Sequence, residues 1–123
     1  MSILTTVNDV ATSGIAFTVP ILVAAIGELI SERAGVLNLS VEGMMLTGAF
    51  AAILGSATTG SPILGVLVAL ISALIFAAAQ AFWSISLRAD QIVVGIAANA
   101  LALGATTFGN RLLLPDAKGQ NVP

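Results

Sequence analysis

Acidic and basic side chains gather in one short part of the chain. It has four Lys or Arg and six Asp or Glu, and four of these ten residues lie between positions 27 and 43: Glu28, Glu32, Arg33 and Glu42. Glu28 and Glu32 share a face on a helix, where two carboxylates repel unless a cation, a proton or water intervenes. These acids could face a water-filled cavity, or they could hold the local structure by pairing with Arg33. We favour the second role, because burying an unpaired carboxylate is costly.

Several kinds of chemistry are missing from the sequence. It contains no cysteine and no histidine, which excludes disulfides, thiol catalysis and the usual zinc sites. A Gly-x-Ser-x-Gly motif is also absent, so we predict no catalytic residues, no metal site and no cofactor, and we do not expect an enzyme. The net charge of -2 comes from scattered residues, so nucleic acid is not expected as a partner.

The composition is that of an integral membrane protein. The chain is 58% hydrophobic and 8% charged, whereas soluble domains carry about 25% charged residues. Uncharged segments of membrane-spanning length cover Val10–Gly27, with Pro20 inside, and Ile92–Gly109. Residues 43–87 are long enough for two spans, with a turn at Gly55–Pro62. We therefore predict an all-α, polytopic domain over residues 1–123 with about four spans. The last twelve residues, 112–123, are expected to begin a loop.

Small residues recur at a spacing of four in the predicted spans. The pairs are Gly48 with Ala52, Ala51 with Gly55, and Ala100 with Gly104. This spacing places small side chains on one helix face, so we expect close packing within the chain or with a second copy. The abundance of alanine and glycine in membrane helices is the simpler explanation for any single pair. Trp83 and Gln80 are expected near the membrane interface.

The charged region predicts a broken helix around residues 35–40. Gly35 suits the left-handed end of one helix, with Arg33 in its last turn. Asn38 or Ser40 can cap a second helix, and Glu42 would lie in its first turn. Gly35 and Gly43 are the expected helix-break glycines. Discontinuous helices often build the binding sites of transporters. A plain interfacial loop between two spans explains the caps equally well.

Two sequence blocks resemble a known family. Residues 27–43, continuing through Met44-Met45-Leu46-Thr47-Gly48-Ala49-Phe50, closely resemble the signature region of ABC transporter permeases. The most similar subgroup imports nucleosides or simple sugars and is related to branched-chain amino acid and ribose permeases. Leu87 to Gly95, followed by Asn99 and Leu103-Gly104, resembles the next recurring block of that subgroup.

The resemblance implies a multi-pass permease subunit in a prokaryotic plasma (inner) membrane. Its implied partners are a second permease subunit in a homo- or heterodimer, a cytoplasmic ATP-binding subunit and an extracytoplasmic substrate-binding lipoprotein. The sequence agrees, because it contains no Gly-x-x-x-x-Gly-Lys-Ser/Thr phosphate loop and so cannot supply the ATPase. Permeases of this family are considerably longer, so we expect the chain to be the incomplete N-terminal portion of one.

Roles for individual polar residues follow from this resemblance as hypotheses. Four amide or hydroxyl side chains could line the pathway of a nucleoside or related small polar solute: Asn38, Ser40, Gln91 and Asn99. For Asn99 we favour an interhelical hydrogen bond, worth about 0.6 kcal/mol on average.

Two other classes of function stay open. The face carrying Glu28 and Glu32 could belong to a small ion channel or a proton-translocating subunit, which would conduct without ATP. The chain could also be a purely structural membrane subunit, in which changes to the charged region would alter assembly but not the choice of solute.

Overall fold

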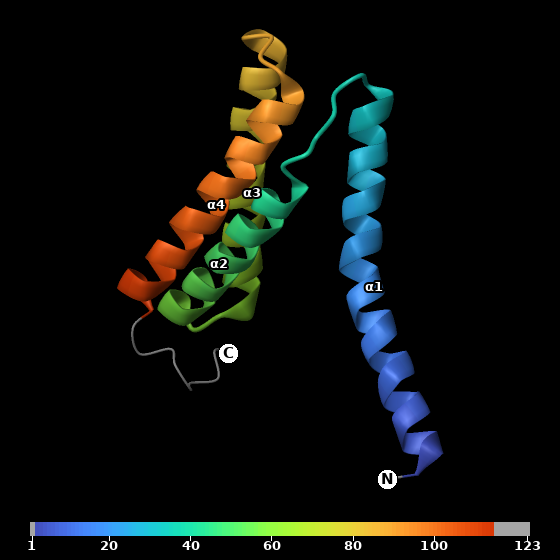
Figure 1. Ribbon diagram of the computed structural model, residues 1–123. Coiled ribbons are helices and arrows are strands. Elements are labelled where there is room, and N and C mark those ends of the chain that lie inside the picture. The colour runs from blue at the N-terminus through green and yellow to red at the C-terminus, as the bar shows by residue number, and fades with distance from the viewer. Residues whose placement is uncertain (1, 115–123) are drawn as a thin grey trace. The chain divides into compact units, whose positions relative to one another are not determined.

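The computed structural model describes residues 2–114 and is helical throughout that range except at its connections. In chain order the elements are α1 (Ile3–Arg33), α2 (Val41–Thr59), α3 (Pro62–Ala81), the π-helical turn η1 (Phe82–Ser86) and α4 (Gln91–Leu113) (Figure 1). Four helical segments are long and apolar enough to cross a membrane, which confirms the all-α, four-span prediction. Most of the expected C-terminal loop, from residue 115 on, lies outside the described residues.

The first compact unit, residues 1–37, is built around α1. This helix contains 31 residues and runs beyond the predicted span at both ends, through Asp9 and Glu28. At 1.5 Å per residue it is about 46 Å long, whereas the hydrocarbon core of a bilayer is about 30 Å thick. Asp9 and Glu28 therefore lie in the extra helical turns on either side of the uncharged residues 10–27. The helix can continue through both residues because these turns need not lie in the hydrocarbon core. Pro20 lies inside α1 without interrupting it.

The end of α1 follows the prediction for Gly35. This glycine has a φ of 83° and its amide donates to the carbonyl of Glu32 at 2.9 Å. The next amide, of Val36, donates to the carbonyl of Ser31 at 3.1 Å. These two bonds form a Schellman motif, which satisfies carbonyls that the helix end leaves without a partner. The hydroxyl of Ser31 donates back to the carbonyl of Val36 at 2.9 Å and ties the turn further.

The second compact unit, residues 38–123, holds the other three helices. Within it, α2 packs against both α3 and α4, whereas α3 and α4 touch each other little (Figure 1). The connection between α2 and α3 is short, because Gly60 takes a left-handed φ of 67° and Pro62 opens α3. The predicted hairpin is therefore confirmed, with its turn at the glycine and proline that predicted it.

Small residues let α2 and α3 approach closely. A methyl group added at Gly55 would lie 3.2 Å from the Cα of Gly65, and one added at Gly65 would lie 2.8 Å from the carbonyl oxygen of Ala52. Both members of the predicted pair, Ala51 and Gly55, are buried, and Gly55 lies in this contact. Lipid gives no hydrophobic drive for helix association, so such close backbone packing supplies much of the attraction.

The pair of Ala100 and Gly104 behaves differently. Both residues are exposed, and no atom lies within 4 Å of the position where a Cβ would stand on Gly104. The buried face of α4 instead carries Gly95, Ala98 and Ala102. The expectation of close packing therefore holds for Ala51 and Gly55 but not, within residues 38–114, for this pair.

Candidate functional site

The start of α2 is a buried polar cluster that brings three helices together. Ser40 occupies the N-cap position, as one of the two predicted alternatives, but its hydroxyl does not bond to the first amides of α2. It lies within hydrogen-bond reach of the side-chain oxygens of Asn38, at 3.0 Å, and of Gln80 on α3. Ser40 is completely buried. Its hydroxyl therefore ties the restart of the chain to α3 instead of capping its own helix.

Asn99 on α4 performs the capping role that local rules assign to Ser40. Its side-chain oxygen accepts a hydrogen bond from the amide of Gly43 at 2.8 Å, and its side-chain nitrogen donates to the carbonyl of Leu39 at 2.8 Å. The amide of Gly43 is one of the first amides of α2, which have no partner within the helix. The interhelical hydrogen bond expected for Asn99 is thus present, and it caps α2 from a different helix. We call this pair of bonds the Asn99 cap.

Two glycines make the Asn99 cap possible. A methyl group added at Gly95 would lie 2.6 Å from the Cβ of Leu39, closer than such atoms can pack. One added at Gly43 would lie 3.0 Å from the side-chain oxygen of Asn99 and 3.0 Å from the ring of Phe76. Gly43 lies inside the first turn of α2 and not in the break itself. Its contribution is the close approach of α4.

Asn38 completes the cluster through local contacts. Its side-chain oxygen accepts from the amide of Ser40 at 3.3 Å, which shapes the turn before α2. Its side-chain nitrogen points to the sulfur of Met44 at 3.7 Å. Of the four proposed pathway residues, the structure therefore brings Asn38, Ser40 and Asn99 to the start of α2. Gln91 lies apart from them, at the first position of α4.

Two further polar residues are buried, Gln80 near the end of α3 and Ser84 in η1. The sequence suggests that Gln80 lies at the membrane interface, but it is only 4% exposed and its side-chain oxygen bonds to Ser40. Ser84 follows one turn later, is 5% exposed, and its hydroxyl has no hydrogen-bond partner among the described residues. The spacing of four between two polar residues in an apolar segment was the available signal, because it places both on one helix face.

The charged link after α3 is held by its own backbone. In η1 the amide of Leu87 donates to the carbonyl of Phe82 at 3.2 Å, five residues back, which widens the last turn. Arg88 takes a positive φ of 51°. Asp90 then caps α4, because its carboxylate accepts from the amides of Ile92 and Val93 at 2.9 and 3.2 Å. Residues 87–90 thus form a short polar link between η1 and α4.

The start of α2 lies further along the axis of α4 than the charged link at residues 87–90. Asn99 follows Gln91 by eight residues, so the Asn99 cap is about 12 Å from the first residue of α4. Apolar side chains on the intervening turns, such as those of Ile92 and Ile96, are more than half exposed and require lipid or another apolar partner. We infer that α2 begins at membrane depth, where irregular backbone is tolerated only inside protein or beside water.

The predicted acids divide between the two units. In the first unit Glu28 is partly buried, while Glu32 and Arg33 are exposed at the end of α1, and Arg33 forms no ion pair with Glu32 there. In the second unit Glu42 is exposed in the first turn of α2, as predicted. The pairing of these acids with Arg33 stays a prediction.

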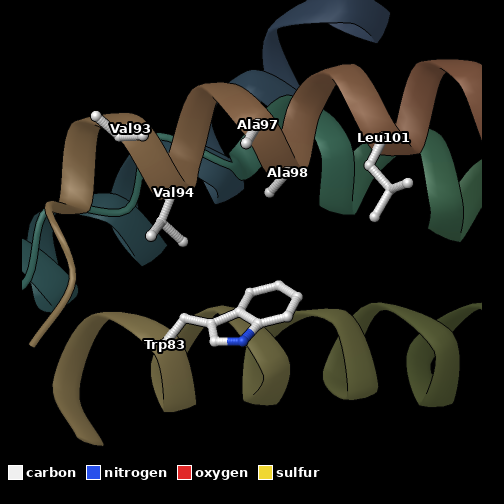
Figure 2. Close-up of a pocket in the computed structure, with 6 residues that line it drawn as sticks. All are labelled: Trp83, Val93, Val94, Ala97, Ala98 and Leu101. Atoms are coloured by element: carbon white, nitrogen blue, oxygen red, sulfur yellow. The ribbon is translucent and has the colours of Figure 1, made fainter. Parts of the chain in front are cut away.

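Of the hollows that residues 38–114 form, two bear on solute binding. One, of about 280 Å³, lies where the indole of Trp83 faces Val94, Ala98 and Leu101 of α4 (Figure 2). Its lining is almost entirely apolar, so it offers a polar solute nothing to bind. The other follows one side of α2 and is lined by residues spaced three or four apart, which we call the Glu42 face: Glu42, Met45, Leu46 and Ala49. This face combines a carboxylate with apolar surface.

Comparison with known proteins gives a consistent result. Residues 10–123 match the family described as the permease component of the branched-chain amino acid transport system. No solved structure matches the chain.

The names of three similar proteins each mention a transported solute. The guanosine ABC transporter permease protein NupQ of Bacillus subtilis is 35% identical over all of this chain, and the nucleoside ABC transporter permease protein NupC of Lactococcus lactis is 30% identical over 88% of it. A Haloferax volcanii protein that carries the name of a glucose ABC transporter permease, TsgC13, is 49% identical over 72% of the chain. The chain spans 40%, 36% and 27% of the lengths of these curated relatives, respectively.

Proposed function

Because the chain belongs to the family of permease components of branched-chain amino acid transport systems, we propose that it forms part of the membrane pathway of an ATP-driven importer. The solute is a nucleoside or a related small polar molecule, such as the guanosine, nucleosides and glucose in the names of its relatives. One structural observation carries the proposal. Three buried or partly buried polar side chains, Ser40, Gln80 and Asn99, join three helices at the start of α2, at a level that we infer to lie inside the membrane.

The proposed roles of the polar residues differ. Ser40 and Asn99 direct their polar atoms at neighbouring backbone and side chains, so we assign them to holding the break open beside the pathway. Asn38 is partly exposed, and Gln91 is partly exposed at the start of α4. We propose that these two side chains contact the solute.

Proposed partners follow from the family. A second permease subunit would complete the pathway, a cytoplasmic ATP-binding subunit would supply energy, and an extracytoplasmic lipoprotein would deliver solute in a prokaryotic plasma membrane. This arrangement fits a chain that carries polar groups at membrane depth and no phosphate loop in its sequence.

The test is transport by the complete transporter that contains this chain, reconstituted in liposomes. We expect labelled guanosine to accumulate when ATP is supplied on the side of the ATP-binding subunit, and not with a non-hydrolysable ATP analogue. Conductance of ions or protons without ATP would instead support the channel in which Glu28 and Glu32 act. Intact assembly without any uptake would support a structural subunit.

A further inference from the structure

We propose that Glu42 recognises the solute by accepting hydrogen bonds from two neighbouring hydroxyl groups. The inference rests on the proposed function and deepens it, since it names a contact residue and the chemical group that it selects. The argument starts from where this carboxylate points. Glu42 is exposed, and helix geometry places it on a different side of α2 from Ala51 and Gly55, which are buried. Within residues 38–114 its carboxylate makes no hydrogen bond or ion pair.

The Asn99 cap fixes the depth of this carboxylate. Gly43, the next residue, bonds to Asn99, so Glu42 shares the level about 12 Å from the first residue of α4. Exposed apolar side chains on α4, including Val93 and Ile96, lie between that level and the charged link. A carboxylate that faced lipid at this depth would be expensive, so intramembrane acids face water, a polar ligand or an opposite charge.

The chemistry of the Glu42 face selects a class of ligand. A carboxylate offers two acceptor oxygens side by side and no donor, which matches two adjacent hydroxyl groups. Met45, Leu46 and Ala49 continue the same face with apolar surface, against which the carbon face of a sugar ring can pack. A ribose or a hexose presents both features. The 2′-deoxyribose of a deoxynucleoside lacks one hydroxyl of the pair and presents only the apolar ring face.

The experiment compares matched solutes in the complete transporter. Uptake of guanosine against 2′-deoxyguanosine is measured for the wild type and for Glu42→Gln, which keeps the shape and removes one acceptor and the charge. We expect the wild type to prefer the solute with the intact diol. In Glu42→Gln its KM should rise at least about tenfold, while the KM of the deoxy solute changes little, so the preference disappears. The control variant Asp9→Asn removes a comparable charge from another helix, α1, and should keep this preference.

Two results would overturn the inference. A Glu42→Gln transporter that discriminates between the paired solutes as well as the wild type excludes a diol contact. A Glu42→Gln transporter that no longer assembles, as judged by size-exclusion chromatography, would assign the carboxylate to assembly and not to solute recognition. Failure of the wild type to take up any of these solutes would contradict the proposed function itself, and it is recognised without any variant.

Discussion

Asn99 joins two backbone groups of the α2 start that would otherwise lack partners. The amide of Gly43 and the carbonyl of Leu39 both bond to its side chain at 2.8 Å. A single interhelical hydrogen bond in a membrane is worth about 0.6 kcal/mol on average, but an orphaned buried group costs about 1–3 kcal/mol. The position of this residue in the middle of α4 therefore bears on stability as well as on the pathway.

We predict that Asn99→Ala destabilises the protein by about 1–3 kcal/mol, because it leaves both backbone groups without partners. The measurement is the thermal unfolding midpoint of the purified transporter in detergent. Asn110→Ala, an exposed position near the other end of α4, is the matched control and should leave the midpoint nearly unchanged. Equal midpoints for the two variants would contradict a structural role for Asn99.

For single residues, the sequence predicts conformations that depend on the residue itself, but not its contacts with residues far away in sequence. Gly35 could be assigned because its left-handed conformation depends on its own lack of a side chain. The partners of Ser40 could not be predicted in the same way, because local capping rules favour a bond from its hydroxyl to the first amides of α2. In the fold, the hydroxyl bonds instead to Gln80, which is forty residues away in sequence. Asn99 was predicted to bond to another helix, but nothing local indicates which one.

Among the elements, α4 shows how a single glycine determines which face of a helix packs. A Cβ on Gly95 would strike Leu39 at 2.6 Å, whereas a Cβ on Gly104 would meet nothing within 4 Å. The two glycines lie on the same helix, so they make a matched pair for one substitution.

We predict that Gly95→Val costs about 1–3 kcal/mol of stability, in the range of other overpacking substitutions, because α4 must move away from Leu39. Gly104→Val should cost little, since an exposed valine suits lipid. The two variants are compared by the fraction that remains monodisperse in size-exclusion chromatography after heating. A Gly104→Val protein as unstable as Gly95→Val would show that another part of the assembly packs against the exposed side of α4.

For the whole molecule, residues 2–114 contain four helices long and apolar enough to cross a membrane, and four successive crossings would place the helix ends alternately on its two sides. We then expect Arg33 and Arg88 on one side and Thr58, at the end of α2, on the other. The sequence predicts the four apolar helices because long uncharged segments are a strong signal. It does not predict the orientation, because Arg33 and Arg88 would share one side and Arg111 and Lys118 the other.

We predict that cysteines introduced singly at positions 33 and 88 react with an impermeant thiol reagent from the same side of sealed vesicles. A cysteine at position 58 should react only from the opposite side. The natural sequence has no cysteine, so each variant has one reactive thiol and the unmodified protein is the blank. Reaction of positions 33 and 88 from different sides would exclude four crossings.

The Asn99 cap also has a consequence for biosynthesis. The amide of Gly43 leaves the ribosome 56 residues before the side chain that accepts its hydrogen bond. While α2 and α3 are entering the bilayer, that amide has to donate its hydrogen bond to water or to the insertion machinery. Only when α4 arrives can it donate to Asn99 instead. Nascent chains that end before Asn99 should therefore hold α2 less firmly than chains that end after it.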